Sequence, residues 1–364
     1  MGGMRKIRVG IIGASSEGGW ALYGHLPALK ALPRFEVTAV CATVREHAEE
    51  VARRHGVPHV FERANALVSH PDVDLVVVAV KAPDHAALVR AAISAGKDVF
   101  CEWPLGTSTS QAAALTKLAD AAKVRTVVGL QRRLSPGVRY LKDLLTEGFV
   151  GTLRSVTLHA AVPMMGSRYR ARETYAADVK NGASMFTVFA AHFLDTVLSA
   201  VGPLRDVSGV IARQFEEATV IETEDPLPVT SPDQVLVQGT LERGAVLSSH
   251  FETGKRSGGG IFFHFTGTEG DLLMSEHLQL SGTQGEDQSF EPLPAPERYA
   301  WLPRGELSPD AYDVGHLYAA YARDVDEGTR LAPDFHEALK LHRLLDAIGR
   351  ASSMGQRQPV TEAL

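Results

Sequence analysis

The sequence VGIIGASSEGGW at residues 9–20 passes from an apolar run into a glycine-rich turn, and residues 22–32 then carry a helical pattern. A turn between a strand and a helix N-terminus presents unpaired N–H groups and the positive end of the helix dipole, and both attract a pyrophosphate. In the G-x-G-x-x-G register the three positions are Gly13, Ser15 and Gly18. We predict that this turn binds a dinucleotide, with the Ser15 hydroxyl as a donor to a phosphate. The alternative is an ordinary strand–helix turn.

Four further apolar runs alternate with helical patterns downstream of this turn. Continuously apolar strands separated by helices are typical of a parallel sheet with both faces covered. Right-handed crossovers then give a doubly wound sheet whose binding site lies at the carboxyl ends of the strands. We therefore predict an N-terminal α/β Rossmann domain over residues 1–135. Its further strands are expected at residues 35–41, 75–80, 98–101 and 126–130.

The pattern changes in the remainder of the chain, residues 136–364. Runs with period-two alternation and glycine-containing turns predict a C-terminal α+β domain with an open, mostly antiparallel sheet, for substrate binding and oligomerisation. Residues 184–198 are expected to form a helix within it, and residues 335–352 a last helix that can pack back on the first domain. Residues 215–232 and 282–303 are rich in Pro and Glu and are expected to be loops.

The composition is that of a globular protein, with 364 residues, 45% hydrophobic and 22% charged, which is long enough for two domains. A formal net charge of -6 disfavours nucleic-acid binding, which needs a concentrated basic face. No uncharged apolar stretch is long enough to span a bilayer, so we expect a cytoplasmic protein. Cys41 and Cys101 fall in strand-like runs, where cysteine packs as a small hydrophobe. The histidines and cysteines are dispersed along the chain, and no spacing predicts a metal site.

The end of the second predicted strand bears on the choice between NADP and NAD. An acidic residue there would bind the ribose 2′-hydroxyl, whereas an Arg accommodates a 2′-phosphate. No acid occurs before Glu46, and Thr43 and Arg45 can both donate to a phosphate. NADP is therefore favoured over NAD. In the alternative interpretation Arg45 is a solvated residue in the first turn of a helix.

Six sequence landmarks follow one another along nearly the whole chain. They are VGIIG at 9–13, HLPAL at 25–29, AGKDVFCEWP at 95–104, QRRLSP at 131–136, HFLD at 192–195 and GTEG at 267–270. In order and spacing they resemble the family of glucose–fructose oxidoreductase, inositol dehydrogenase and rhizopine catabolism protein. The resemblance implies a Rossmann domain that binds a nicotinamide dinucleotide and a second domain that presents proton-transfer residues to the substrate.

The chain departs from that family at two catalytic motifs. The family's Glu-Lys-Pro, whose Lys is thought to contact nicotinamide and substrate, reads EWP at residues 102–104, with Trp103 at the Lys position. The family's Asp-x-Gly-x-His places two side chains on one helix face, and here Val188 and Ala190 stand at the Asp and Gly positions. Only His192 remains for proton transfer. Because general acid–base assistance is typically worth about 10²–10⁴-fold, we expect the usual mechanism to be severely weakened.

The same departures resemble a subgroup of the family, represented by the fungal galactose-regulon corepressor. That protein binds a dinucleotide, regulates rather than catalyses, and also carries Glu-Trp in place of Glu-Lys. The long first loop with a Trp, here residues 13–25, and the pattern Q-x-R-x-S-P at residues 131–136 are similar as well.

Three residues are candidates for catalysis. His192 is the predicted acid or base, and the alternative is a hydrogen-bonded core histidine on an apolar helix face. Tyr169 and Tyr175 lie in the basic, aromatic segment 168–175, and either could supply the missing proton donor because a Tyr hydroxyl can be a general acid. The alternative there is a solvated loop.

Several further residues are predicted to contact the cofactor. Trp103 is expected to stack on the nicotinamide or the substrate, or else to pack as core. Glu102 is expected to contact the ribose hydroxyls, or else to pair with Arg132 or Arg133. His85 falls where the family places a residue near the nicotinamide. The complete predicted set is Gly13, Ser15, Ser16, Gly18, Trp20, Thr43, Arg45, Val80, Lys81, His85, Glu102, Trp103, Pro104 and Gln131.

Two functional hypotheses follow. The first is an NAD(P)-dependent oxidoreductase that transfers hydride to or from a sugar, cyclitol or related polyol, with Trp103 and Val188 making the site atypical. The alternative is a non-catalytic NAD(P)-binding sensor or transcriptional regulator. We expect a homodimer or homotetramer formed through the C-terminal sheet, because an open sheet leaves one face to cover.

Overall fold

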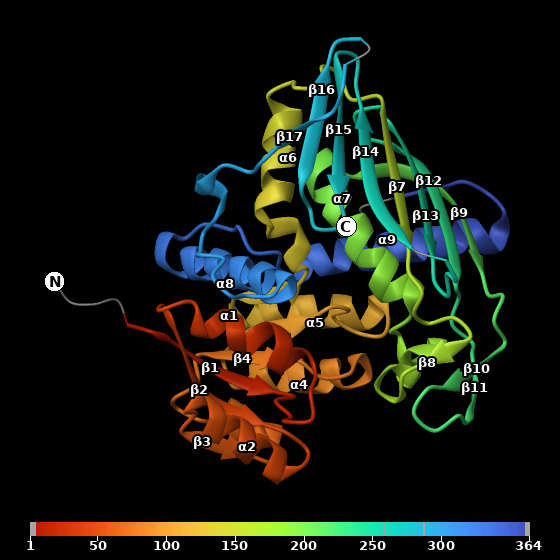
Figure 1. Cartoon of the computed structure of the whole chain (residues 1–364). Coiled ribbons are helices and arrows are strands. Elements are labelled where there is room, and N and C mark those ends of the chain that lie inside the picture. Colours follow the sequence, from red (N-terminus) through yellow and green to blue (C-terminus); the bar gives the residue numbers. More distant parts are fainter. Residues whose placement is uncertain (1–4, 258, 287, 361–364) are drawn as a thin grey trace. The chain divides into compact units, whose positions relative to one another are not determined.

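The computed structural model describes residues 5–257, 259–286 and 288–360 of the chain (Figure 1). Strands and helices are mixed throughout, and the chain divides into two compact units. Within the described ranges, no helix has both the length and the apolar character that a bilayer crossing would need.

A six-stranded parallel sheet forms the centre of the first unit. The strand order β3-β2-β1-β4-β5-β6 reverses where β1 meets β4, and this reversal is the point at which doubly wound sheets bind ligands. The predicted Rossmann topology is confirmed. The sequence does not predict β3, because its three half-buried residues at the sheet edge carry no apolar pattern. The strands are β1 (Ile7–Ile12), β2 (Phe35–Cys41), β3 (His59–Phe61), β4 (Leu75–Val78), β5 (Asp98–Glu102) and β6 (Thr126–Gly129).

The helices of the first unit begin and end where local chemistry directs. The side chain of Ser108 accepts a hydrogen bond from the Gln111 amide and so caps α5, while Gly56 ends α2 in the left-handed conformation. The four residues of β4 are all buried, which explains their uninterrupted Leu-Val-Val-Val sequence. The helical segments are the π-turn η1 (Ala21–His25), α1 (Leu26–Lys30), α2 (Arg45–His55), α3 (Ala64–Val68), α4 (Ala82–Ser94), α5 (Thr109–Ala122) and the 3₁₀-turn η2 (Gln131–Leu134).

A long helix from late in the chain belongs to the first unit. This helix, α8 (Pro309–Glu327), is capped by Ser308, whose hydroxyl accepts from the Ala311 amide. It packs beside α1 and buries Tyr318 completely against Phe35 and Phe100 (Figure 1). No helix is predicted here from the sequence pattern.

The two units therefore differ from the predicted domains. The predicted boundary follows residue 135, and the first unit ends its initial segment at Leu134 but also includes Ala300–Leu339. The reason is the aromatic core that α8 shares with the first sheet. The last helix, α9 (Phe335–Met354), begins in the first unit and continues into the second, which comprises Ser135–Tyr299 and the chain from Lys340.

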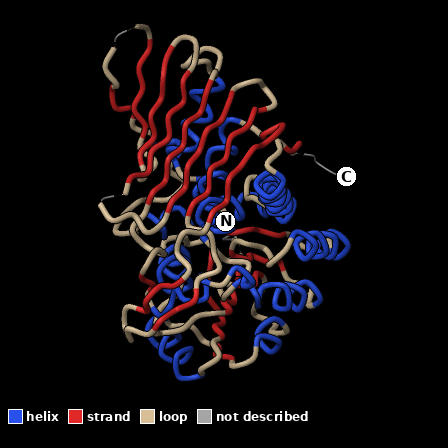
Figure 2. Tube along the Cα trace, turned by 90° about the vertical axis from the view of Figure 1, so that its right-hand side faces the viewer, coloured by secondary structure: helices blue, strands red, loops and turns tan. Residues whose placement is uncertain are grey.

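The second unit is built on a nine-stranded sheet of order β17-β16-β15-β14-β7-β13-β12-β9-β18 (Figure 2). Only β7 and β13 pair in parallel among its described ladders, so the sheet is mostly antiparallel, as predicted. Its strands are β7 (Ser155–Ala161), β9 (Leu204–Ala212), β12 (Gln234–Leu241), β13 (Val246–Glu252), β14 (Gly260–Thr266), β15 (Gly270–Ser275), β16 (Leu280–Gln284), β17 (Glu291–Leu293) and β18 (Gln358–Pro359).

Helices cover one face of this sheet. Phe193 of α7 (Ala191–Val201) lies 5.9 Å, between ring centroids, from Phe263 of β14. Ser352 of α9 accepts a hydrogen bond from the Ile211 amide of β9 at 2.9 Å. The helix α6 (Pro136–Thr146) packs beside α7.

The opposite face of the sheet is open in the single chain. It presents large apolar side chains, with Val210 55% and Val246 52% exposed. Phe262 and Leu236 are exposed as well.

Two segments expected to be loops contain short strands. Residues 215–232 hold β10 (Glu217–Val220) and β11 (Pro226–Pro228), which form a small sheet with β8 (Arg168–Tyr169). Residues 282–303 include the end of β16, then β17 and the 3₁₀-turn η6 (Glu297–Tyr299). Strands of three or four residues with Pro and Glu carry no period-two signal, and this explains why the sequence misses them.

Candidate functional site

The glycine-rich turn has a backbone that requires glycine. Gly13 has a φ of +101°, and a Cβ there would lie 2.3 Å from the carbonyl oxygen of Ala79. Gly18 and Gly19 also have positive φ values, of 125° and 112°. The chain therefore leaves β1 in close contact with the segment after β4, at the switch point of the sheet.

The first amides of the turn are already engaged. The N–H groups of Gly13 and Ala14 both donate to the carbonyl of Cys41, at 2.9 and 3.1 Å. These bonds extend the pairing of β1 with β2. The amides of Ser15 and Gly18 also donate within the turn, to the carbonyls of Gly13 and Ser15 at 3.1 and 3.3 Å, and the amide of Glu17 donates to the Ser15 hydroxyl. The amides of Ser16, Gly19 and Trp20, which have no such bond among the described residues, are therefore the candidates for a phosphate.

The hydroxyl of Ser15 holds the turn in shape. It accepts a hydrogen bond from the Glu17 amide at 3.3 Å and lies 3.3 Å from Nδ1 of His47 in α2. Nε2 of the same imidazole lies 3.5 Å from the Glu17 carboxylate. Sequence reasoning missed His47, although its place in the first turns of α2, two residues after Arg45, was a usable signal. Ser16 is half-buried beside Ser15.

Trp20 leads from the turn into the π-turn η1. A Cβ on Gly24 would lie 3.1 Å from the indole, so this glycine makes room for the ring. The indole N–H is buried and has no hydrogen-bond acceptor among the described residues. Isolated π-turns are frequent at functional sites, and this one ends at His25.

Glu102, at the end of β5, faces the fully buried imidazole of His25. Oε1 of Glu102 lies 2.9 Å from Nε2 of His25, a close contact that is not aligned as a hydrogen bond. The predicted alternative partner Arg133 instead pairs with Glu337 at 2.9 Å. A Cβ on Gly129 of β6 would lie 2.4 Å from the other oxygen of Glu102. The carboxylate therefore occupies space between the carboxyl ends of β5 and β6.

The second nitrogen of His25 contacts Tyr318 of α8. Nδ1 lies 2.7 Å from the Tyr318 hydroxyl, and burial raises the pKa of that hydroxyl well above its usual value. The hydroxyl thus keeps its proton, and the imidazole lies between this hydroxyl on Nδ1 and the Glu102 carboxylate on Nε2. Sequence reasoning used His25 only as a family landmark and missed Tyr318, because it assigned no helix to α8.

His85 connects the ends of two strands. Its Nδ1 lies 2.7 Å from the carbonyl of Pro104 and its Nε2 lies 3.0 Å from the carbonyl of Val80. Both ring nitrogens therefore face the main chain, and the imidazole positions the segments after β4 and β5. Lys81 is exposed at the start of α4, and Trp103 is only 5% exposed.

Gln131 follows β6 at the same edge of the sheet. Its side chain is 7% exposed, and its Oε1 is buried without a hydrogen-bond partner among the described residues.

The two predicted phosphate donors after β2, Thr43 and Arg45, are exposed. Arg45 pairs with Glu49 at 2.7 Å and with Glu62 at 3.6 Å, so it has the character of a first-turn helix residue.

His192 lies in the second unit, near the start of α7. The helix is preceded by the π-turn η5 (Met185–Ala190), which Ser184 and Thr187 cap reciprocally. His192 is half-buried, and its main-chain carbonyl accepts a hydrogen bond from the Thr196 hydroxyl at 2.7 Å. Val188, at the family's Asp position, lies within the π-turn.

The two tyrosine candidates differ in their surroundings. Tyr169 is 3% exposed in the core of the small sheet, and its hydroxyl donates to the Met165 carbonyl at 3.4 Å. Burial raises the pKa of Tyr169 to about 12, which argues against a role as proton donor. Tyr175 is half-buried, and burial together with Glu173 raises its pKa as well.

Comparison with known families matches both parts of the chain. Residues 7–130 match the oxidoreductase family with an NAD-binding Rossmann fold, and residues 136–276 match the C-terminal domain of Gal80p. The dehydrogenase aclE of Aspergillus oryzae is 29% identical and covers 97% of this chain and 98% of its own.

Solved structures share the fold across both units. A super-repressor mutant of Gal80p from Saccharomyces cerevisiae matches with a TM-score of 0.87 and 22% identity, covering 98% of each chain. A levoglucosan dehydrogenase in complex with NADH and levoglucosan matches with a TM-score of 0.84 and 21% identity, covering 98% of this chain and 100% of that one. The chain belongs to the glucose–fructose oxidoreductase, inositol dehydrogenase and rhizopine catabolism family, and its second domain is of the Gal80p C-terminal type.

Proposed function

We propose that the protein binds a nicotinamide dinucleotide at the switch point of the first unit and uses it to oxidise or reduce a CH–OH group of a sugar, cyclitol or related polyol. The observation that carries the binding proposal is a pair of buried polar atoms without hydrogen-bond partners among the described residues. They are Nε1 of Trp20, in the segment that follows β1, and Oε1 of Gln131, directly after β6, so both belong to segments that leave the carboxyl edge of the sheet. Because buried polar groups are almost always satisfied, a polar ligand is expected there.

The residues fit such a ligand in their chemistry. Glu102 can accept from ribose hydroxyls, and the indole N–H of Trp20 can donate to an oxygen of the ligand. The later amides of the glycine-rich turn can donate to the pyrophosphate, because Gly18 and Gly19 have no side chains that would obstruct its approach. We therefore retain the predicted cofactor contacts, with His85 and Ser15 as positioning residues.

Oxidoreduction is supported by the full-length similarity to a dehydrogenase. A bound nicotinamide supplies or accepts a hydride, and the substrate hydroxyl must then gain or lose a proton. We propose that His192 exchanges this proton, with Tyr175 rather than the buried Tyr169 assisting. The levoglucosan dehydrogenase structure, which contains NADH and a sugar derivative, is consistent with this use of the fold.

We propose NADP in preference to NAD. No carboxylate lies between the end of β2 and Glu46, and Arg45 is the nearest cation in sequence. The contacts of Arg45 with Glu49 and Glu62 oppose this choice. However, exposed ion pairs contribute little to stability, so a doubly charged phosphate can replace them. The affinity for NADPH should fall towards that for NADH in Arg45→Ala.

A second function is favoured by one observation. The positions of the family's Lys and Asp carry Trp103 and Val188, neither of which can transfer a proton. With both absent, a dinucleotide sensor without turnover is the second candidate, in line with the Gal80p-type second domain.

One experiment separates the candidates. The purified protein is titrated with NADPH and NADH by calorimetry and then assayed against a panel of sugars and polyols by the absorbance of the reduced nicotinamide. Turnover that is lost in His192→Ala, but kept in the control His277→Ala at an exposed site, supports the enzyme. Tight binding with no turnover on any compound supports the sensor. No binding of either dinucleotide contradicts both.

We also propose that the open face of the nine-stranded sheet pairs with a second copy of the chain. The exposed apolar residues on it, among them Val210, Val246 and Phe262, favour burial. Light scattering should give at least a dimer for the native chain and a smaller species for Phe262→Lys.

A further inference from the structure

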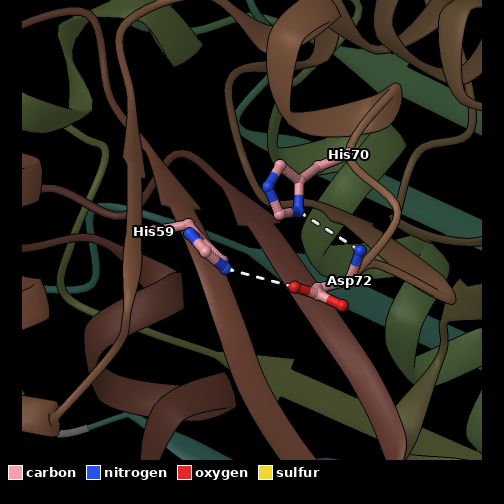
Figure 3. Close-up of side chains that lie close together, drawn as sticks. All are labelled: His59, His70 and Asp72. Carbon is pink, nitrogen blue, oxygen red and sulfur yellow. Dashed lines mark hydrogen bonds and ion pairs between the residues drawn. The ribbon is translucent and has the colours of Figure 1, made fainter.

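A cluster of potential metal ligands lies in the first unit. His59 is the first residue of β3, while His70 and Asp72 lie in the loop between α3 and β4 (Figure 3). One ligand atom from each residue lies within 4.8 Å of the other two. We propose that these three side chains bind a zinc ion. None of them is among the proposed dinucleotide contacts, so the two proposals can fail independently.

The separation of His59 and Asp72 suits a shared ion. Nε2 of His59 lies 3.4 Å from Oδ2 of Asp72. Tetrahedral zinc holds nitrogen and oxygen ligands at about 2.0–2.2 Å, which places two such ligand atoms about 3.4 Å apart. The rings of His59 and His70 lie 4.2 Å apart between centroids. A ligand atom of His70 lies within 4.8 Å of the other two, so His70 can supply the third ligand if the three side chains close around the ion.

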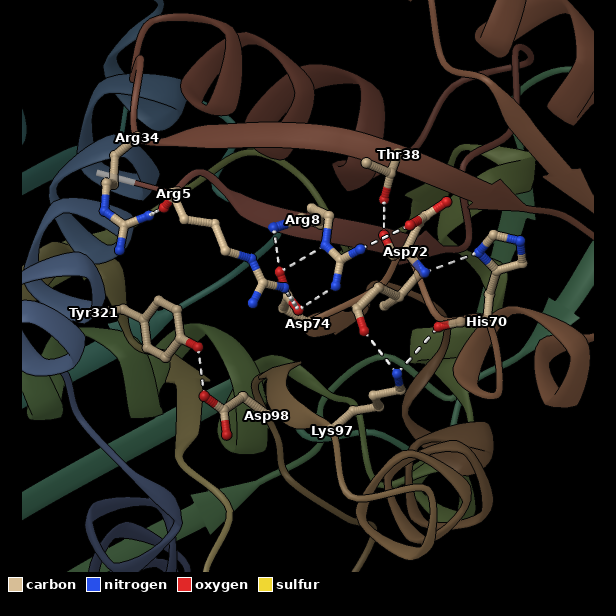
Figure 4. Close-up of polar contacts among 11 residues, drawn as sticks. Arg5, Arg8, Arg34, Thr38, His70, Asp72, Asp74, Lys97, Asp98 and Tyr321 are labelled. Carbon is tan, nitrogen blue, oxygen red and sulfur yellow. Dashed lines mark hydrogen bonds and ion pairs between the residues drawn. The ribbon is translucent and has the colours of Figure 1, made fainter. Parts of the chain in front are cut away.

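Asp72 is held so that one carboxylate oxygen remains for a metal. Nη1 of Arg8 donates to Oδ1 at 2.7 Å, and the hydroxyl of Thr38 donates to the Asp72 carbonyl at 2.5 Å (Figure 4). Oδ2 is left facing His59. Hydrogen bonds of this kind orient ligating carboxylates in metal sites.

The loop that carries His70 is fixed through its main chain. Nζ of Lys97 donates to the carbonyls of His70 and Val73, at 3.1 and 2.7 Å (Figure 4). The amide of Asp72 donates to Nδ1 of His70 at 3.2 Å, so this nitrogen presents a lone pair within the cluster. An unprotonated ring nitrogen is what a metal requires, and coordination would replace a long hydrogen bond.

The donor set favours a transition-metal ion such as zinc. Two imidazoles and one carboxylate suit zinc, whereas magnesium and calcium prefer sets made of oxygen alone. Three protein ligands leave a fourth position for water or another small ligand. The cations Arg8 and Lys97 lie close by, so the affinity should be lower than in sites with four protein ligands. A bound ion would fasten the edge strand β3 to the loop before β4.

The test uses the full chain after removal of metal by a chelator and without a histidine tag. Calorimetry with zinc chloride should give one site, and cobalt(II) should give the visible absorption of a low-symmetry four-coordinate complex. Asp72→Asn and His70→Gln should each weaken zinc binding by at least about 100-fold, since even outer-shell changes cost about 10–100-fold. His277→Gln, at an exposed histidine, should bind zinc as the native chain does.

The thermal midpoint of each variant without metal shows whether the variant is folded. Zinc should raise the midpoint of the native chain, and magnesium should leave it unchanged. If folded Asp72→Asn and His70→Gln both bind zinc as tightly as the native chain, the proposal is wrong. It is also wrong if the native chain binds no zinc, or if cobalt gives only the weak absorption of the hexa-aqua ion.

Discussion

Nε2 of His25 lies 2.9 Å from Oε1 of Glu102, the last residue of β5. The pair continues through Nδ1 of His25 to the hydroxyl of Tyr318, 2.7 Å away. A helix from late in the chain thus contacts a histidine near its beginning, and that histidine lies against the carboxylate that we expect to bind ribose.

Removal of the Tyr318 hydroxyl should break the contact with His25 while the aromatic ring still fills its place in the core. Tyr318→Phe is expected to lower the free energy of unfolding by about 1–3 kcal/mol, because Nδ1 of His25 loses its partner in a buried site. Urea denaturation measures the change. Tyr321→Phe, which loses a hydrogen bond to Asp98, is the matched control for stability and should leave the dinucleotide affinity unchanged.

Glu102→Gln should reduce dinucleotide affinity while keeping the shape of the side chain. Ribose hydroxyls lose a charged acceptor, and hydrogen bonds to charged groups are worth about 1.5–3 kcal/mol, or roughly 10- to 150-fold in the dissociation constant. Fluorescence titration with NADPH measures the effect. An unchanged dissociation constant would mean that Glu102 is purely structural.

Gly13→Ala should abolish dinucleotide binding or unfold the turn. A methyl group there would meet the Ala79 carbonyl at 2.3 Å, and φ is +101°. Gly96→Ala is the matched control, because its φ is +69° but no atom lies within 4 Å of the added carbon. The control should show the backbone strain alone, of order 1–2 kcal/mol, by thermal melting. Equal effects of the two variants would contradict the role given to the close approach of β1 and β4.

Acidification should destabilise the second unit through His342. Burial lowers the pKa of this imidazole to about 4, whereas an unfolded chain would titrate near 6.5. Between these values the unfolded state binds more protons, so stability falls as pH falls from 6.5 to 4 and is independent of this group above 6.5. His342→Gln should flatten that part of the stability curve measured by urea denaturation. His277→Gln, at an exposed site, should not.

Tyr169 and Tyr175 should respond differently to loss of the hydroxyl if the chain turns over a substrate. Tyr169→Phe is expected to leave kcat within about twofold, since its hydroxyl contacts only a main-chain carbonyl at 3.4 Å among its described hydrogen bonds. Tyr175→Phe should lower kcat by roughly 10²-fold or more if its hydroxyl assists proton transfer. Steady-state kinetics measures kcat for both variants. A larger loss of kcat in Tyr169→Phe than in Tyr175→Phe would make Tyr169 the candidate proton donor again.

The parallel sheet could be predicted because strands buried on both faces need uninterrupted apolar runs. The four buried residues of β4 are the clearest case. The short strand β3 lacks that signal, since an edge strand is only half-buried. The ends of helix α8 could have been predicted from Ser308 and Pro309 at its start and Gly328 after its last turn. Its aromatic residues do not show by themselves that the helix packs on the first sheet.

The candidate site was less predictable because it depends on contacts between distant residues. The conformations of Gly13 and Gly18 agree with their motif positions, whereas the burial of Tyr169 could not be read from its basic surroundings. The cluster of His59, His70 and Asp72 has no metal-binding spacing along the chain, and only the fold brings it together. His25 and Tyr318 are separated by 293 positions.

The late position of α8 has a consequence for biosynthesis. The strands of the first sheet leave the ribosome early. The aromatic side chains of α8 that cover their core are synthesised only after most of the second sheet. At about 5–20 residues per second, the delay is roughly 10–35 s. During this interval Phe35, Phe100 and His25 lack their covering helix. The nascent amino-terminal half is therefore the stage at which this protein should depend most on chaperones, and a fragment that stops at Leu134 should not be obtainable as a stable domain.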